Sequence, residues 1–144
     1  MSGAEEKGFT LLELLVAITL ALILLAAAPG LLNPGAGSLE KATGMVAAEL
    51  RRARAAAMTR GEDAAVLFDA DNGRLRDADG VETALPAGVS LSLRMAAEVR
   101  EARGAPGVIF FPEGGSTGGI AILRRGEAVA RVETRWLTGA VHVE

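Results

Sequence analysis

The chain has 144 residues, with 15 Lys and Arg against 18 Asp and Glu, a formal net charge of −3 and no cysteine. This length allows one soluble domain of about 100 residues beside an apolar segment. The lack of cysteine excludes disulfides and thiolate chemistry, and the charge balance argues against bulk attraction to nucleic acid.

An apolar segment runs from Phe9 to Ala28 and contains one charge, Glu13. About twenty residues in a helix span roughly 30 Å, the thickness of the hydrocarbon core of a bilayer, so we expect a transmembrane helix. A carboxylate inside such a helix is costly, which makes Glu13 a candidate functional residue. The alternative is that Glu13 lies shallow enough to be hydrated at the membrane interface. Gly8, a poor helix former, directly precedes the segment.

Two simpler interpretations of this segment compete. A secretory signal peptide has a basic start, an apolar stretch of about 7 to 15 residues and a cleavage site of small residues. Ala26-Ala27-Ala28 supplies such a site, but the apolar stretch is longer, glutamates precede it and Pro29 would follow the cut. A plain membrane anchor accounts for the hydrophobicity but explains neither the glycine before the segment nor the carboxylate within it.

The start of the chain resembles the class III signal of type IV pilins and type II secretion pseudopilins. Gly8-Phe9-Thr10-Leu11-Leu12-Glu13 follows a short hydrophilic leader, residues 1–8, and opens the apolar segment. The resemblance implies that a prepilin peptidase cleaves between Gly8 and Phe9 and methylates the new amine of Phe9. It also implies that Glu13 meets the Phe9 amine of a neighbouring subunit during assembly. Such a charge pair offsets the cost of burying either charge alone.

Residues 29–60 are predicted to form a hinge followed by an amphipathic helix. Pro29-Gly30 and the cluster from Asn33 to Gly37 contain helix breakers, which favour a flexible joint over one continuous helix. Ser38 can cap the helix that follows. Its apolar face recurs at spacings of three and four residues and comprises Leu39, Ala42, Val46, Leu50, Ala53 and Ala57.

Arginines crowd the end of this helix, at Arg51, Arg52, Arg54 and Arg60. We interpret them as solvated charges that are favourable near the negative end of the helix. A stripe that binds nucleic acid is the alternative.

From Gly61 the apolar residues recur with a period of two, which predicts an antiparallel sheet over residues 61–144. We expect five to seven short strands, drawn from residues 64–68, 74–76, 89–95, 108–111, 120–123, 129–134 and 140–143. Turns are expected at Asp71-Asn72-Gly73, at Asp79-Gly80 and at Arg125-Gly126-Glu127. Residues 96–105 are expected to form a loop with a helical turn. The fold class is therefore α+β and pilin-like: a long N-terminal hydrophobic helix, with a break allowed near Pro29–Gly37, packed on a C-terminal antiparallel β-sheet.

The C-terminal part carries a second resemblance, to H-type minor pseudopilins and their relatives among minor pilins. It lies in two stretches, residues 111–119 (FPEGGSTGG) and residues 136–139 (WLTG), separated by a strand. The resemblance implies a structural subunit of the pseudopilus of a type II protein secretion system. Such a subunit is a single-pass protein of the bacterial inner membrane, with its N-terminus in the cytoplasm and its C-terminal domain in the periplasm.

The same resemblance implies the partners. They are the prepilin peptidase, other major and minor pseudopilins, the inner-membrane assembly platform and the lipid bilayer, with no nucleic acid. The alternative is a minor pilin of a type IV pilus, with a role in assembly, adhesion or DNA uptake. A signal-anchored periplasmic enzyme is the rival from another class.

We find no sequence pattern that predicts a catalytic residue, a metal or a cofactor. The glycine-rich loop from Gly114 to Gly119 lacks the Lys-Ser/Thr of a phosphate-binding P-loop, so we interpret it as a flexible loop that touches a neighbouring subunit. Residues 69–73 (DADNG) resemble the start of a calcium loop, but the glycine is misplaced and no glutamate follows at the twelfth position, which favours a bare turn.

Three further side chains have ordinary structural interpretations. His142, the only histidine, is expected to be a strand residue. Ser116 has no nearby base in the sequence. Trp136 is expected to lie in the sheet and cover apolar core surface, with an interface role as the alternative.

Overall fold

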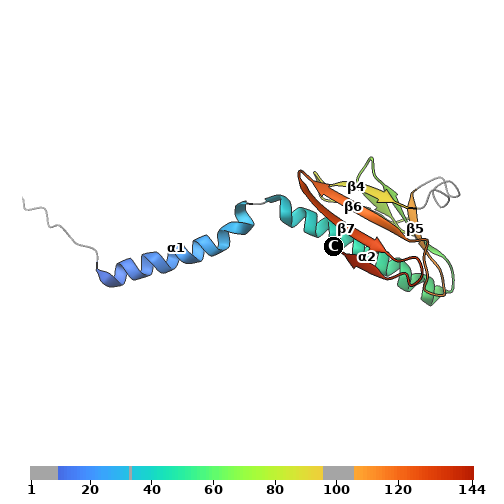
Figure 1. Ribbon diagram of the computed structural model, residues 1–144, viewed down its shortest axis with the longest axis horizontal. Helices are drawn as coiled ribbons and strands as arrows, with labels where there is room; N and C mark the ends of the chain where they lie inside the picture. The colour runs from blue at the N-terminus through green and yellow to red at the C-terminus, as the bar shows by residue number, and fades with distance from the viewer. Residues whose placement is uncertain (1–9, 33, 96–105) are drawn as a thin grey trace, which may run out of the picture. The chain divides into compact units, whose positions relative to one another are not determined.

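The computed structural model describes residues 10–32, 34–95 and 106–144, with the side chains of residues 25–36 excepted (Figure 1). The chain divides into two compact units, Met1–Pro34 and Gly35–Glu144. The expected loop at residues 96–105 lies outside the described residues.

The first unit consists of helix α1, Leu11–Leu32. It continues through Pro29 and Gly30, so the proline does not end the helix, because a proline inside a helix removes one backbone hydrogen bond and bends the helix more often than it stops it. Within the part of the chain that is described, no helix combines the length and the apolarity needed to cross a membrane.

Helix α2, Pro34–Arg60, belongs to the second unit from Gly35 onward. The predicted start at Ser38 is wrong by about one turn, because proline needs no N–H partner in the first turn and its fixed backbone angle suits a helix start. The predicted apolar face is confirmed: Leu39, Ala42, Val46, Leu50, Ala53 and Ala57 are all buried.

The strands form two antiparallel sheets of four strands each, not the single sheet expected from the sequence. The first sheet has the order β3-β2-β1-β5 and the second β4-β6-β7-β8. Their bounds are β1 Ala64–Asp69, β2 Arg74–Arg76, β3 Glu82–Ala84, β4 Ser90–Arg94, β5 Gly107–Phe110, β6 Gly119–Arg125, β7 Ala128–Thr134 and β8 Val141–Val143. Seven of these strands fall where the alternation of apolar residues placed them, and β3 is the strand that the sequence analysis missed.

The predicted turn at residues 71–73 joins β1 to β2. The Asp69 carboxylate accepts hydrogen bonds from the backbone N–H of Asn72 at 3.1 Å and from its side-chain amide at 2.8 Å. These bonds hold the pKa of the Asp69 carboxyl below its ordinary value. Gly73 closes the turn at a φ of 60°, a conformation that favours glycine. Residues 69–73 therefore form a turn, in which both the backbone and the side chain of Asn72 bind the carboxylate of Asp69.

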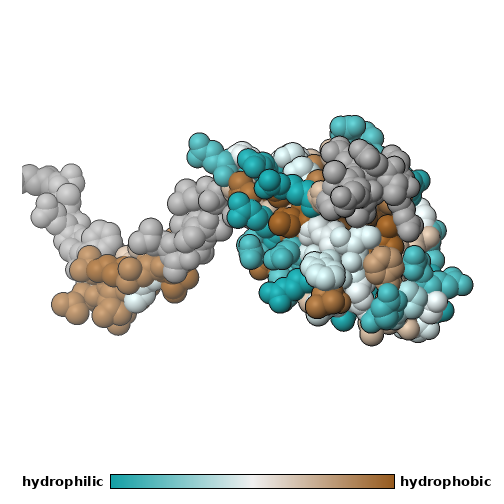
Figure 2. All heavy atoms as spheres, turned by 45° about the vertical axis from the view of Figure 1, so that its right-hand side comes forward, coloured by the Kyte–Doolittle hydropathy of each residue, from teal (hydrophilic) through white to brown (hydrophobic). Residues whose placement is uncertain are grey.

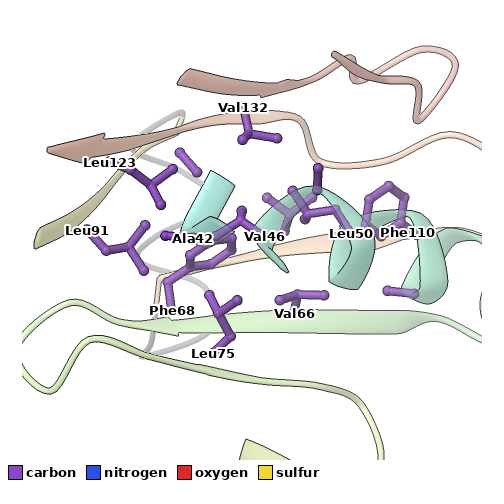
Figure 3. Packing of buried hydrophobic residues seen from close by; sticks show 14 of the residues in the cluster. Ala42, Val46, Leu50, Val66, Phe68, Leu75, Leu91, Phe110, Leu123 and Val132 are labelled. Atoms are coloured by element: carbon purple, nitrogen blue, oxygen red, sulfur yellow. The ribbon is translucent and has the colours of Figure 1, made fainter. Parts of the chain in front are cut away.

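One hydrophobic core lies between α2 and both sheets (Figure 3). Val46 and Leu50 of α2 meet side chains from the first sheet and from the second sheet. The first sheet contributes Val66, Phe68, Leu75 and Phe110, and the second contributes Leu91, Leu123 and Val132. Each large side chain buried in this way contributes about 1.5–3 kcal/mol, so α2 holds the two sheets together as one domain.

Candidate functional site

The start of α1 is capped by Thr10. Its hydroxyl oxygen accepts a hydrogen bond from the backbone N–H of Glu13 at 3.2 Å, and its carbonyl accepts one from the N–H of Leu14 at 3.1 Å. This is the geometry of an N-cap, and Thr-x-x-Glu is the sequence of a capping box. The sequence analysis did not use this signal, which lies inside the resemblance motif. Gly8 and Phe9, the predicted cleavage site, lie outside the described residues.

The carboxylate of Glu13 is exposed and has no hydrogen bond or ion pair with any residue that the structure describes. A complete capping box also has a hydrogen bond from the backbone N–H of the cap residue to the glutamate carboxylate. No such bond from Thr10 to Glu13 is present among the described residues. Thr19, the other polar side chain of residues 11–24, donates its hydroxyl to the carbonyl of Val16 at 2.8 Å. Glu13 is thus the one polar group of residues 11–24 whose side chain is left for a partner.

Apart from Glu13 and Thr19, the described side chains of residues 11–24 of α1 are apolar, and Figure 2 shows one face of this segment in brown. The exposed side chains are Leu11, Leu12, Leu14, Leu15, Val16, Ile18, Leu20, Leu22, Ile23 and Leu24. A helix that is hydrophobic all round is stable only when lipid or other helices surround it. The N-terminal site therefore combines an apolar rod with a single carboxylate in its first turn.

Arg51, Arg52 and Arg60 of α2 are exposed and Arg54 is half-buried, and each of the four guanidinium groups has a hydrogen-bond partner. Arg52 pairs with Glu49 and with Asp77, both at 2.6 Å. Arg60 donates two hydrogen bonds to Asp79, at 2.8 and 3.1 Å. The hydrogen bonds and the charge of Arg60 hold the pKa of the Asp79 carboxyl below its ordinary value. These two guanidinium groups attach the turn between β2 and β3 to the helix. Arg51 and Arg54 bind only backbone carbonyls among the described residues, so two of the four positive charges are paired with carboxylates.

The glycine-rich loop is tied to the rest of the second unit, which corrects its interpretation as a flexible loop. Ser116 is only 5% exposed. Its N–H donates to the carbonyl of Trp136 at 2.8 Å, and its hydroxyl donates to the carbonyl of Arg135 at 3.1 Å. The same hydroxyl accepts a hydrogen bond from the N–H of Gly118 at 3.1 Å. The loop after β5 is thereby joined to the turn after β7, and Gly118 packs closely against Trp136.

The sequence analysis placed Trp136 in the sheet, and this prediction is wrong. Trp136 lies in the turn between β7 and β8. It is 69% exposed, as is its neighbour Leu137. Hydrogen bonds from the N–H of Gly139 to the carbonyl of Arg135 at 2.8 Å and from the N–H of Arg135 to the carbonyl of Ala140 at 2.9 Å close the turn. The alternative that the sequence analysis kept open, an interface role, is the one compatible with this exposure.

Other candidate sites have structural roles. His142 lies in β8, as predicted, and is exposed. The described residues contain no group of three or more His, Cys, Asp or Glu side chains that could hold a metal ion. Within the described residues, hydrogen bonds join the Ser116 hydroxyl to backbone groups, the carbonyl of Arg135 and the N–H of Gly118, and not to a basic side chain.

Comparison with known proteins identifies the family. Residues 4–29 match the prokaryotic N-terminal methylation motif. The chain is 31% identical to the type II secretion system protein H of Xanthomonas campestris pv. campestris over 139 residues, which cover 95% of this chain and 82% of that protein.

Solved structures confirm the pilin-like α+β fold. The minor pseudopilin EpsH of the type 2 secretion system of Vibrio cholerae superposes with a TM-score of 0.60 at 17% identity, covering 74% of this chain and 96% of that one. The type IV minor pilin FimU of Pseudomonas aeruginosa superposes with a TM-score of 0.59 at 12% identity, covering 75% and 89%.

The fold alone does not separate a pseudopilin from a pilin, because these two TM-scores are nearly equal. The sequence does, since its 31% identity to the secretion protein extends over almost the whole chain. An apolar helix with a lone carboxylate, a methylation motif and this fold occur together here, and the chain belongs to the family of type II secretion system protein H, the minor pseudopilins.

Proposed function

We propose that this chain is the precursor of a minor pseudopilin, which a prepilin peptidase cleaves between Gly8 and Phe9 and methylates at Phe9. The observation that carries the proposal is the 31% identity to a type II secretion protein H over 95% of the chain, with the methylation motif at residues 4–29. Residues 1–8 would be the leader peptide and residues 9–28 the transmembrane and assembly helix. Residues 29–60 would form a hinge and amphipathic helix, and residues 61–144 the sheet domain.

The mature protein would be a single-pass protein of the bacterial inner membrane, with its N-terminus in the cytoplasm and its sheet domain in the periplasm. Its partners would be the other major and minor pseudopilins and the inner-membrane assembly platform. Assembly would bury α1, whose surface is apolar on every side from Leu11 to Leu24, among the helices of neighbouring subunits.

Glu13 would set the register of that assembly. Its carboxylate has no partner among the described residues, and a charge left alone in a helix bundle is strongly unfavourable. Cleavage after Gly8 creates a positive amine on Phe9. A neighbouring subunit that places its Phe9 amine against Glu13 offsets both charges, whereas a subunit shifted along the helix axis does not.

The experiment compares wild type with Glu13→Gln and Gly8→Val in cells that assemble the pseudopilus. Glu13→Gln preserves size and removes the charge, so we expect normal membrane insertion and cleavage but a loss of filament incorporation, measured by cross-linking to the other pseudopilins. Gly8→Val should leave the precursor uncleaved, as measured by mass spectrometry of the N-terminus. Wild-type assembly of Glu13→Gln, or a mature Gly8→Val protein that begins at Phe9, would contradict the proposal.

A minor pilin of a type IV pilus is the second candidate, because FimU superposes almost as well as EpsH. Deletion of the gene separates the two functions. Loss of protein secretion with intact pili supports the pseudopilin, and loss of pili or of DNA uptake with intact secretion supports the pilin.

A further inference from the structure

The turn after β7 carries the most exposed large apolar side chains described in the second unit. Trp136 and Leu137 are each 69% exposed, whereas every other exposed large apolar side chain of that unit is 55% exposed or less. A tryptophan and a leucine held in water cost free energy unless another surface covers them, and tryptophan is enriched among the residues that dominate protein interfaces. This turn is therefore a candidate contact surface.

The turn is held rigidly from two directions. Ser116 binds the carbonyls of Arg135 and Trp136 from the loop after β5. Gly118 packs so closely below it that an added Cβ would lie 3.1 Å from the Cβ of Trp136. Arg54 of α2 lies against Gly139, where an added Cβ would come within 3.0 Å of its Nε. A surface fixed before binding loses little conformational entropy when the partner arrives.

A hollow of about 780 Å³ opens beside the indole. Its apolar wall includes Met95 and Ile120, together with Trp136 and Leu137. Thr117, Gly118 and Gly119 also line it. The hollow therefore has room for an apolar side chain of a partner, which would lie beside the indole.

The rim of the hollow is positively charged. Arg94 and Arg135 stand on it with one carboxylate, that of Glu133. None of these three side chains has an ion-pair partner among the described residues. The two guanidinium groups can therefore pair with carboxylates of a partner protein. Complementary charge of this kind both attracts the partner and orients it.

We propose that the turn at residues 135–139 and its adjoining hollow dock the globular domain of another pseudopilin, which inserts an apolar side chain flanked by Asp or Glu. The proposal rests on the function proposed above, since it places the partner in the same filament. Trp136 is the central contact, and Arg94 and Arg135 select the acidic flanks. Rim charges of this kind orient the partner, while the aromatic centre determines how long it stays.

The test uses the full-length chain in cells that carry the secretion system. p-Benzoylphenylalanine is placed at position 137, beside an intact Trp136, and at position 129 as the control. Val129 is also exposed, at 44%, but lies on β7 away from the hollow. After irradiation, the cross-linked partner and its peptide are identified by mass spectrometry, and the N-terminus of the same sample reports whether processing occurred.

We expect position 137 to cross-link a protein that carries its own N-terminal methylation motif, through a peptide containing Asp or Glu beside apolar residues. The yield should exceed that at position 129 by at least about tenfold. Trp136→Ala should lower the yield about tenfold, whereas Trp136→Phe should retain most of it. Replacing both rim arginines by glutamate should lower it similarly, and replacing both by lysine should retain it.

Several results would overturn the proposal while leaving the pseudopilin function intact. These are cross-links from position 137 to a second copy of this chain, to phospholipid or to nucleic acid, equal yields at positions 137 and 129, or yields that the Trp136 variants do not change. A wild-type chain that is not processed at Phe9 refutes the proposed function instead.

A second measurement uses the purified chain alone. Trp136 is the only tryptophan and the chain has no tyrosine, so the intrinsic fluorescence reports this site directly. We expect emission at the wavelength of free tryptophan in the same buffer and detergent. Emission at a clearly shorter wavelength would mean that the surface is already covered within the chain and would contradict the proposal.

Discussion

Ser116→Ala should weaken the second unit more than any other substitution of a single oxygen in its loops. The hydroxyl of Ser116 binds both the loop after β5 and the turn after β7, with contacts of 3.1 Å to the carbonyl of Arg135 and 3.1 Å to the N–H of Gly118. Alanine fits the space but supplies neither bond. The backbone bond from the N–H of Ser116 to Trp136 remains.

The size of the effect follows from burial. Ser116 is 5% exposed and Gly118 is also buried, so water does not readily replace the lost hydroxyl. A buried donor left without a partner costs about 1–3 kcal/mol, and we expect a loss of about 2 kcal/mol in the free energy of unfolding. That corresponds to a roughly thirtyfold change in the unfolding equilibrium and to a midpoint lower by about 10 °C for a domain of this size.

Urea unfolding of the full-length chain in detergent, followed by circular dichroism, measures this loss. Ser90→Ala is the matched control, because the Ser90 hydroxyl also donates to a backbone carbonyl, that of Arg124 at 3.4 Å, but at an exposed position of β4. We expect the control to change stability by less than about 0.5 kcal/mol. A Ser116→Ala midpoint that coincides with the Ser90→Ala midpoint would refute the reasoning.

Three further predictions concern other parts of the chain. Leu50→Ala removes a side chain of α2 that is 1% exposed and should cost about 2–5 kcal/mol in urea unfolding, whereas Leu50→Met should cost less than about 1.5 kcal/mol. Thr10→Val removes the cap of α1, so the amide of Glu13 should exchange its hydrogen several times faster in micelles, while Thr10→Ser should retain protection. Asn72→Ala should lower stability at neutral pH, because hydrogen bonds from Asn72 depress the folded-state pKa of Asp69. This contribution to stability is present above the pKa of Asp69 in the unfolded state and is lost as the pH falls through its lower pKa in the folded state. The wild-type and Asn72→Ala urea midpoints should therefore converge as the pH falls below about 4, and a constant difference would contradict this.

Local patterns in the sequence predicted most of the elements. The apolar face of α2 and the strands around Val66, Leu91 and Val132 could be recognised because burial on one side forces a period of 3.6 or 2 in neighbouring residues. Strand β3 could not, because its residues Glu82–Ala84 are exposed or half-buried and pair only with β2 at the edge of a sheet. An edge strand with neither face buried shows no periodicity.

The division into two sheets was also beyond the sequence. Alternation shows which side of a strand is buried, but not which strand lies beside it. Strand β1 pairs with β5 across a long stretch of chain, and β4 pairs with β6 in the other sheet. Both pairings depend on contacts between distant residues, which no short-range pattern encodes.

The candidate sites divide in the same way. The lone carboxylate of Glu13 could be found from composition alone, since one charge stands in an apolar run. The sequence Thr-x-x-Glu at residues 10–13 indicates the cap at Thr10, but the sequence analysis did not use it. Trp136 was misplaced because the turn that holds it, closed by Gly139, was interpreted only as part of the resemblance motif. The bond from Ser116 to Arg135 joins residues 19 apart, and only the folded chain brings them together.

The core that α2 shares with both sheets has a mechanical consequence. A pulling force applied along the axis of α2 at its Pro34 end would act parallel to the interface between the helix and the sheets. It would load all the buried side chains from Leu39 to Ala57 at the same time, instead of separating them one after another. The ion pairs of Arg52 and Arg60 resist the same sliding near the other end of the helix. Withdrawing the helix must uncover both sheets in a single rupture, so resistance to pulling depends on the rate of that one event. Such a domain transmits force along its helix with little stretching until the load exceeds the strength of the whole interface.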